Sequence, residues 1–266
     1  MWECPDFFPL GDKHVLIYSA EHKTFWEVGT YDKSKFHFHP ERKGLLDYGA
    51  YYAPKSMLDG RKRRILWGWV QETRSREAIE AAGWAGCLSL PRVLTLRGDN
   101  QLQIEVASEF ASLRTNTVTI QQPQDTTELS NALSRGIIHG RAGEVLCKFR
   151  VGESACGLDL HLSSNDDAVS LLTISYNGAN DQPLVAIGDK VVPLNPDRDG
   201  ISSLHIWIDG SVIETFVDER QVITSRCYTA SSEAADIQVV WRGSVAMLKS
   251  LIVSNLRPVS DDRLTA

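Results

Sequence analysis

Short runs in which apolar and polar residues alternate recur along most of this chain, and turn-forming residues separate them. Residues 14–19, 24–29 and 64–70 are clear examples, separated by Gly, Asp, Pro and Lys. A period of two residues places alternate side chains on opposite faces of an extended strand, as in a half-buried β-strand. The helical period is rare, so the pattern predicts an all-β fold of antiparallel strands.

Two segments depart from this pattern. The run 76–82 is rich in Ala and Glu and precedes Gly83, which predicts a short helix that ends at a glycine. Around 105–114 the apolar residues follow a helical period, which predicts a helical connection between two halves of the chain. Enough strands are expected beyond it for a two-sheet sandwich. They are 145–150, 158–163, 169–176, 204–208, 212–217, 222–227, 237–241 and 248–253.

The charge of the chain narrows the classes of partner. The formal net charge is −6 and the sequence pI is about 5.7, whereas binding to a nucleic-acid backbone requires clustered positive charge. The one basic cluster, 61–64, follows Asp59-Gly60, a pair typical of hairpin turns. No run approaches the roughly 18 apolar residues that a membrane helix needs. We therefore expect neither a nucleic acid nor a membrane as partner, and a neutral sugar remains compatible.

The cysteines and the paired histidines do not form a metal motif. The five cysteines are scattered without a C-x-x-C pair, so we interpret them as mostly buried thiols. A bridge between Cys147 and Cys156 across a hairpin stays open. His37 and His39 have no third ligand at a suitable spacing and are interpreted as exposed strand residues. We expect no metal and no cofactor.

Several motifs are more specific than the strand pattern. They are Met-Trp-Glu-Cys-Pro-Asp-Phe-Phe at 1–8, Asp-Tyr-Gly-Ala-Tyr-Tyr-Ala-Pro-Lys-Ser at 47–56, 63–70, 83–92, 208–216 and Thr224-Ser225-Arg226. In this order they resemble the motifs of the retaining fructosidases of glycoside hydrolase family 32, from residue 1 to about 255. The resemblance implies a partial five-bladed β-propeller of about two blades over 1–105 and a C-terminal β-sandwich over 117–258. A linker over 106–116 and a tail over 259–266 complete the expected domains.

The resemblance also implies a reaction. Retaining hydrolysis of a glycoside uses two carboxyl groups about 5–5.5 Å apart, one as nucleophile and one as acid/base. Glu3 matches the acid/base, although without the surrounding motifs it would be interpreted as a surface residue. The family's nucleophile lies in a Trp-Met-Asn-Asp-Pro-Asn-type motif and its transition-state partner in an Arg-Asp-Pro motif, and neither occurs here. We therefore expect a truncated chain, with the first blades missing upstream, that is inactive alone.

The same resemblance implies five substrate-binding residues. Cys4 would form the pocket wall beside the acid, Tyr52 and Trp69 would offer aromatic faces to the sugar, and Glu72 would contact hydroxyl groups. Asp47 matches a carboxylate that binds the substrate beyond the fructosyl unit, but an Asp before Tyr-Gly is equally a turn residue. Three positions later this chain has Ala where plant-type invertases often have Lys, so preference between sucrose and fructan stays open.

Two functions are thus expected. The first is that of a fragment of a retaining hydrolase that cleaves β-fructofuranosidic bonds in sucrose or fructans. The alternative is a non-catalytic carbohydrate-binding or interaction protein built on the β-sandwich. The expected partner is sucrose or a fructan oligosaccharide. An open propeller arc is also expected to self-associate or to need the missing N-terminal propeller segment. The compartment stays open, because any export signal would lie upstream, and a secreted or periplasmic location is preferred to a cytoplasmic one.

Overall fold

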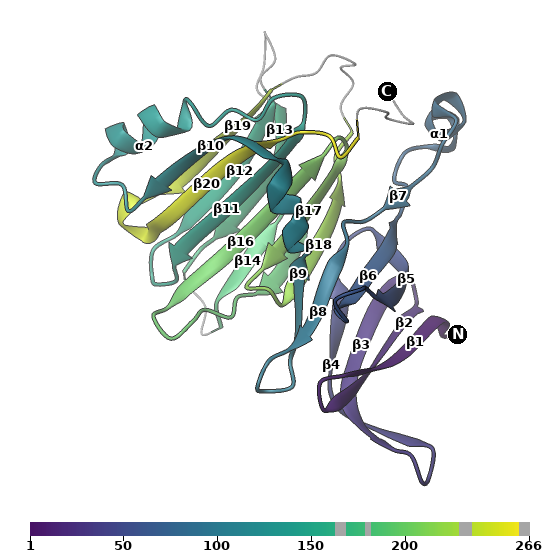
Figure 1. Cartoon of the computed structure of the whole chain (residues 1–266). Helices are drawn as coiled ribbons and strands as arrows, with labels where there is room; N and C mark the ends of the chain where they lie inside the picture. Colours follow the sequence, from purple (N-terminus) through teal and green to yellow (C-terminus); the bar gives the residue numbers. More distant parts are fainter. Residues whose placement is uncertain (163–168, 179–181, 229–235, 261–266) are drawn as a thin grey trace. The chain divides into compact units, whose positions relative to one another are not determined.

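Antiparallel strands make up most of the molecule in the computed structural model, which describes residues 1–162, 169–178, 182–228 and 236–260. The chain divides into two compact units (Figure 1). Unit 1 comprises Met1–Ala107 and Glu219–Arg226, and unit 2 comprises Ser108–Asp218 and Cys227–Ala266. The segment Glu219–Arg226 is thus part of unit 1 although it lies far along the chain.

The first sheet of unit 1 contains four antiparallel strands in the order of the sequence, β1-β2-β3-β4. Alternate residues of β2 are buried, and Val15 and Ile17 pair directly with the buried residues Val28 and Trp26 of β3. These side chains share one face of the sheet, as the period of two predicts. The strands are β1 (Glu3–Leu10), β2 (Lys13–Ala20), β3 (Lys23–Asp32) and β4 (His37–Asp47).

The second sheet of unit 1 has the order β5-β6-β8-β9, and β7 pairs with the last residues of β6. Between β6 and β7 the chain forms helix α1, which begins after Ser75, whose hydroxyl accepts from the Ala78 amide. The helix ends at Gly83, which has φ +74°. The elements are β5 (Tyr51–Leu58), β6 (Arg64–Val70), α1 (Arg76–Ala82), β7 (Cys87–Leu88), β8 (Arg92–Leu96) and β9 (Leu102–Val106).

Strand β18 (Gln221–Arg226) belongs to unit 1 and runs beside the turn that follows β4. The amides of Tyr48 and Ala50 donate to the carbonyls of Val222 and Thr224 at 2.9 and 2.7 Å. A Cβ at Gly49 would lie only 2.0 Å from the Thr224 carbonyl oxygen, so the close approach requires glycine there.

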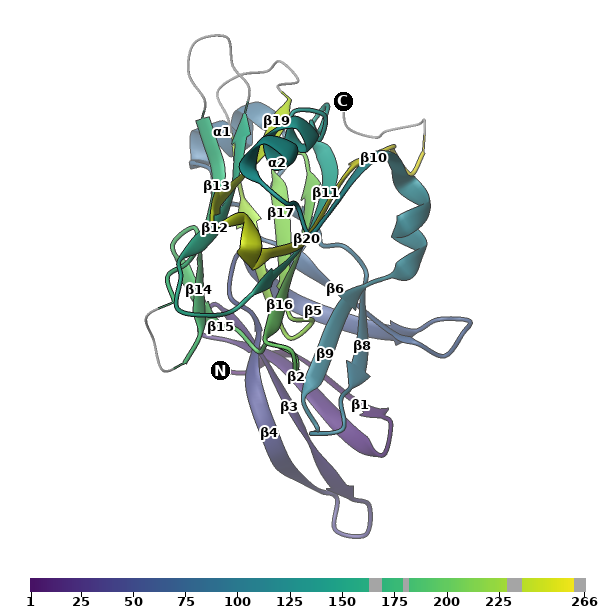
Figure 2. The same ribbon diagram turned by 90° about the vertical axis from the view of Figure 1, so that its left-hand side faces the viewer.

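Unit 2 consists of two antiparallel sheets stacked as layers (Figure 2). One has the order β10-β20-β11-β16-β17 and the other β15-β14-β13-β12-β19. Phe149 of one sheet packs near Tyr176 and Trp241 of the other, with ring centroids 5.9 and 6.4 Å away, so the core lies between the layers.

The first sheet contains β10 (Arg114–Gln121), β11 (Ala142–Arg150), β16 (Ile201–Asp209), β17 (Val212–Val217) and β20 (Leu248–Leu256). The second contains β12 (Cys156–Leu162), β13 (Val169–Tyr176), β14 (Leu184–Ile187), β15 (Lys190–Pro193) and β19 (Ile237–Gly243). The helices of unit 2 are α2 (Thr126–Leu133) and the 3₁₀-helices η1 (Ser108–Leu113) and η2 (Val245–Met247).

The predicted strand 64–70 and the predicted helix 76–82 occur with the same bounds as β6 and α1. The helical prediction over 105–114 was only partly right. Val106 ends β9, Ser108–Leu113 form a 3₁₀-helix and Arg114 begins β10, so strand pairing on both sides shortens the helical segment. The exact domain boundaries stay a prediction, and residue 163 and most of the expected tail, 261–266, lie outside the described residues.

All five cysteines are free thiols, so the possible bridge between Cys147 and Cys156 is absent. Burial raises the pKa of both thiols, that of Cys156 to about 12. They therefore behave as small apolar core residues. Within the described ranges, neither α1 nor α2 nor any other helix has the length and apolar character needed to cross a membrane.

Candidate active site

Glu3 and Tyr52 come from different sheets of unit 1 and meet through a hydrogen bond. The Tyr52 hydroxyl donates to Oε2 of Glu3 at 2.5 Å. This bond, with smaller contributions from desolvation and from the Glu3 charge, raises the pKa of Tyr52 to about 12. The phenol therefore stays a donor toward the Glu3 carboxylate over the whole physiological pH range.

A β-bulge lies immediately after each of these two residues. The pairing of β1 with β2 shifts register after Glu3, and Cys4 has φ +50°. The pairing of β5 with β6 shifts after Tyr52, and Ala53 has φ +47°. Bulges change the direction of nearby side chains, and a left-handed backbone at a residue other than glycine persists only where its surroundings hold it.

Hydrogen bonds between the two sheets hold both bulges. The Ala53 amide donates to the buried hydroxyl of Ser19 at 3.1 Å, and Ser19 is the strand partner of Glu3. Asp6 Oδ2 accepts from the amide and the hydroxyl of Ser56 at 2.7 and 2.6 Å. These hydrogen bonds between the two sheets thus hold the carboxylate of Glu3 next to the phenol of Tyr52.

Tyr52, Trp69 and Leu88 form a row across three strands. Tyr52 pairs directly with Trp69, and Trp69 pairs directly with Leu88, so the three side chains share one face of the sheet. Trp69 is 42% exposed and Leu88 is 73% exposed. With Glu3 bonded to Tyr52, the row presents a carboxylate, a phenol and an indole, the kinds of group that contact a sugar. Cys4, half-buried at the bulge, lies next to Glu3 in the chain.

Asp47 has a different setting from the row. Its side chain is fully buried, as is that of Arg92, and the two form an ion pair at 2.9 Å. Asp47 also accepts from the Gly49 amide at 2.8 Å and from the amide and hydroxyl of Thr224 at 3.0 and 2.6 Å. Arg92 stacks on the Tyr51 ring at 4.1 Å. The geometry favours the interpretation of Asp47 as a residue that holds the turn and β18.

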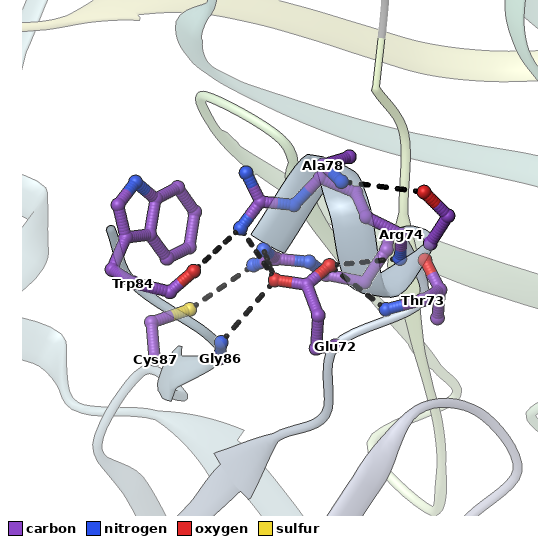
Figure 3. A network of polar contacts seen from close by, with 9 residues as sticks. Glu72, Thr73, Arg74, Ala78, Trp84, Gly86 and Cys87 are labelled. Atoms are coloured by element: carbon purple, nitrogen blue, oxygen red, sulfur yellow. Dashed lines mark hydrogen bonds and ion pairs between the residues drawn. The ribbon is translucent and has the colours of Figure 1, made fainter. Parts of the chain in front are cut away.

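Glu72 likewise binds its own chain. Oε1 accepts from the amides of Thr73 and Arg74 at 2.9 and 3.0 Å, and Oε2 accepts from the Arg74 guanidinium at 2.7 Å and the Gly86 amide at 3.3 Å (Figure 3). The side chain is only 6% exposed. These bonds fit a role in shaping the loop between β6 and β7 better than a contact with substrate hydroxyls.

Three residues of this region had no assigned role in the sequence: Arg92, Thr224 and Arg226. Each stands in a motif quoted above, which was the available signal. Their partners lie far away in the sequence, so no local pattern pointed to the contacts.

The paired histidines lie at the start of β4. His37 and His39 pack edge to face with ring centroids 4.3 Å apart. Across the parts of the chain that the structure describes, no group of three His, Cys, Asp or Glu side chains is placed to hold a metal ion.

Two family models match nearly the whole chain. The model of the glycosyl hydrolases family 32 N-terminal domain matches residues 1–105, and that of the family 32 C terminal matches residues 109–255. The chain is 38% identical over 146 residues to fructan 1-exohydrolase of Aegilops speltoides and 40% identical over 146 residues to β-fructofuranosidase, insoluble isoenzyme 4, of Oryza sativa subsp. japonica. These matches cover 46% of this chain but only 24% and 25% of the relatives, about a quarter of their length.

Solved structures show the same fold. Fructan 1-exohydrolase IIa from Cichorium intybus superposes with a TM-score of 0.73 at 22% identity, covering 96% of this chain and 62% of that chain. Sucrose-6-phosphate hydrolase from Lactobacillus gasseri gives 0.73 at 21% identity, covering 97% and 55%. Relatives of this fold have been solved with 1-kestose, for the Cichorium intybus enzyme, and with sucrose, for a Bombyx mori β-fructofuranosidase.

The predicted fold class, a partial five-bladed propeller of about two blades followed by a sandwich, is confirmed. Because the two family models together match most of its residues, the chain belongs to glycoside hydrolase family 32.

Proposed function

We propose that this chain supplies the acid/base half of a retaining β-fructosidase that acts on fructans or sucrose. The observation that supports this most directly is the contact of Glu3 with Tyr52, in a row with the exposed Trp69, inside a family 32 chain. The named activities of the relatives, fructan 1-exohydrolase and β-fructofuranosidase, give the substrate class.

In this mechanism Glu3 gives its proton to the leaving glycosidic oxygen while a second carboxylate attacks the anomeric carbon and forms an ester with the fructosyl unit. Glu3, now ionised, then takes a proton from the water that breaks this ester and releases fructose. Tyr52 donates a hydrogen bond to the ionised Glu3, and Trp69 holds the sugar through its ring face. Cys4 would form the wall beside Glu3.

The attacking Asp is proposed to come from outside these 266 residues. Neither of the family's two aspartate motifs occurs in the sequence, and with one carboxyl group the covalent route is closed. We therefore expect no fructose release from the purified chain alone.

Binding tests the part of the proposal that this chain can perform. Titration calorimetry with 1-kestose should detect a complex that persists in Glu3→Gln, because the neutral amide keeps the shape of the side chain. Trp69→Ala should lose most of the affinity, because it removes the aromatic face on which the sugar is proposed to stack. Phe36→Ala is the control, since Phe36 is 84% exposed and lies between β3 and β4. Equal affinity of Trp69→Ala and the unmodified chain would contradict the proposal.

A second candidate function rests on a groove in unit 2. It has a volume of about 390 Å³, lies between α2 and β19, and is lined by no charged side chain among the described residues. Its lining residues include Thr126, Ser130 and Gln238, which are polar and uncharged and suit a neutral saccharide. If this sandwich groove were the binding site, Gln238→Ala would weaken fructan binding while Trp69→Ala would leave it unchanged.

A further inference from the structure

Arg226 is a buried cation whose role the proposed function leaves open. It ends the Thr224-Ser225-Arg226 motif on β18, and its side chain is only 1% exposed. Its guanidinium donates to Cys87 Sγ at 3.2 Å, lies 3.7 Å from Glu72 Oε2 and faces the Trp84 ring at 5.5 Å. All three partners lie within residues 71–87, the connection that runs from the end of β6 to the first residue of β7. A buried charge destabilises the fold unless it is paired. Moving the connection away from Arg226 would leave its charge without these partners, so the contacts hold the connection in place.

In the connection, residues 71–87, the guanidinium groups of Arg74 and Arg226 both lie beside the carboxylate of Glu72. Arg74 bonds Glu72 at 2.7 Å and the Trp84 carbonyl at 3.0 Å, and its guanidinium stacks on the Trp84 ring at 4.2 Å. The Gly86 amide completes the closure by donating to Glu72 (Figure 3). Both ends of the connection are therefore held at the same carboxylate, and Arg226 is the group that reaches it from another strand.

The backbone that carries Arg226 is itself fixed. Asp47 binds the amide and the hydroxyl of Thr224, and the Thr224 carbonyl accepts from Ala50 at 2.7 Å. Arg92 donates to the Thr224 hydroxyl at 2.8 Å. The cation thus projects from a strand whose residue Thr224 is hydrogen-bonded to Asp47, Ala50 and Arg92 of unit 1.

The far end of the connection packs against Trp69. A Cβ at Gly86 would lie 2.0 Å from the Trp69 indole nitrogen, so only a glycine fits between them. Gly86 also has φ +69°, a second reason for glycine. The next two residues pair with β6, and Leu88 is the direct partner of Trp69. Any displacement of Gly86 therefore changes the surroundings of the indole.

From these contacts we propose that Arg226 is a positioning residue for the sugar-binding row: it holds the 71–87 connection and, through Gly86, sets the position of Trp69. The proposal rests on the proposed function in that Trp69 is taken as the sugar platform. The motif Thr224-Ser225-Arg226 then serves substrate binding from a strand distant in sequence, without touching the substrate.

The test compares Arg226→Met, Arg226→Lys and the control Arg76→Met in the full chain. Arg76 lies on the same connection but pairs with Glu80 at the surface, with 87% and 65% of the two side chains exposed. In Arg226→Met, the amide hydrogen-exchange rate of the peptide covering 72–87 should rise about tenfold or more, because a buried charged contact is lost. Arg226→Lys should show a smaller rise, because one charge and one donor remain, and Arg76→Met should show none.

A second readout follows Trp69 itself. The indole N–H resonance of Trp69, assigned with Trp69→Phe, should shift in Arg226→Met and stay in place in Arg76→Met. The affinity for 1-kestose should fall in parallel in Arg226→Met. Exchange of the buried β2 peptide serves as the internal check that the variant is folded.

The two proposals fail in different ways. If the unmodified chain does not bind 1-kestose, the proposed function fails. The role of Arg226 is then still tested by the Trp69 indole resonance and by the hydrogen exchange of residues 72–87. An unchanged Trp69 resonance, or unchanged exchange over 72–87 in Arg226→Met, would overturn that role. Faster exchange over 72–87 and a shifted Trp69 resonance, together with an unchanged affinity for 1-kestose, would also overturn the role of Arg226. Sugar binding by Trp69 would then not depend on the position of the 71–87 connection.

Discussion

At the scale of single residues, the contact between Tyr52 and Glu3 makes the phenol an unusually weak acid. Its hydrogen bond to the carboxylate raises the pKa of Tyr52 to about 12, from the ordinary 10.0. A raised pKa in the folded state means that the protonated phenol stabilises the fold fully below pH 10.0 and that this contribution disappears as the pH rises through about 12.

We predict that the Tyr52 phenol titrates near pH 12 and that Glu3→Gln returns it toward 10.0. Tyrosine labelled with ¹³C at Cζ reports the titration by NMR, and Tyr52→Phe identifies the resonance. The same titration curve in the Glu3→Gln variant would show that the carboxylate is not the cause.

Asp47 allows a test of the buried ion pair. Asp47→Ala leaves the guanidinium of Arg92 buried without its carboxylate, so we predict a loss of about 3–5 kcal/mol in the unfolding free energy of unit 1. Urea unfolding followed by tryptophan fluorescence measures it, since most tryptophans lie in unit 1. The control Glu80→Ala removes an exposed pair and should change the value by about 0.5 kcal/mol or less. Similar losses in the two variants would argue against the buried network.

At the scale of the elements, one carboxylate connects three strands of unit 2. Glu144 of β11 accepts from His205 Nε2 of β16 at 2.5 Å and from the Arg114 guanidinium of β10. Burial alone would raise the pKa of Glu144, but these hydrogen bonds and charges outweigh it and lower the pKa below 4.5.

A lowered carboxylate pKa contributes stability that is fully present above 4.5 and is lost as the pH falls through the folded value. We therefore predict that unit 2 loses stability steeply on acidification below pH 4.5, and that Glu144→Gln flattens this slope. Thermal unfolding at a series of pH values, followed in the far-ultraviolet circular dichroism, measures the effect. An equally steep acid slope in Glu144→Gln would refute the assignment.

Elements with strong local signals were predictable, and elements that depend on pairing were not. The helix 76–82 followed from Ser75 before it and Gly83 after it, which act through neighbouring residues. Helix α2 had a comparable signal that was missed. Asp125 caps the Glu128 amide at 2.8 Å, and the Glu128 side chain returns to the Gln124 amide at 2.8 Å. The short strand β14 pairs with β13 on one side and with the short strand β15 on the other, and the sequences of β14 and β15 were too short to show a period.

In the candidate site too, the residues could be identified from the sequence but their contacts could not. Glu3, Tyr52 and Trp69 were identified because each stands in a motif that resembles the family's. Their spatial relation depends on two bulges and on pairing between strands, which the linear pattern does not encode. Asp47 and Thr224 are 177 positions apart, so their contact follows only from the tertiary fold.

At the scale of the whole molecule, unit 1 exposes several large apolar side chains. Large exposed residues of unit 1 include Trp2, Met57, Leu58 and Leu88. Exposed apolar groups and unpaired strand edges favour association. We predict concentration-dependent self-association of the purified chain in sedimentation velocity, reduced in a Met57→Lys, Leu58→Lys double variant. A single monomeric species at all concentrations would contradict this.

The central claim is that these residues contain the acid/base half of a fructosidase and that the attacking carboxylate is supplied by another segment. The most direct test fuses a family 32 propeller segment carrying the Asn-Asp-Pro-Asn and Arg-Asp-Pro motifs upstream of this chain and measures fructose release from 1-kestose. The account predicts no release from the chain alone, release from the fusion, and a loss of about 100-fold or more from the fusion with Glu3→Gln. Fructose release by the chain alone, or a fusion whose activity does not depend on Glu3, would contradict it.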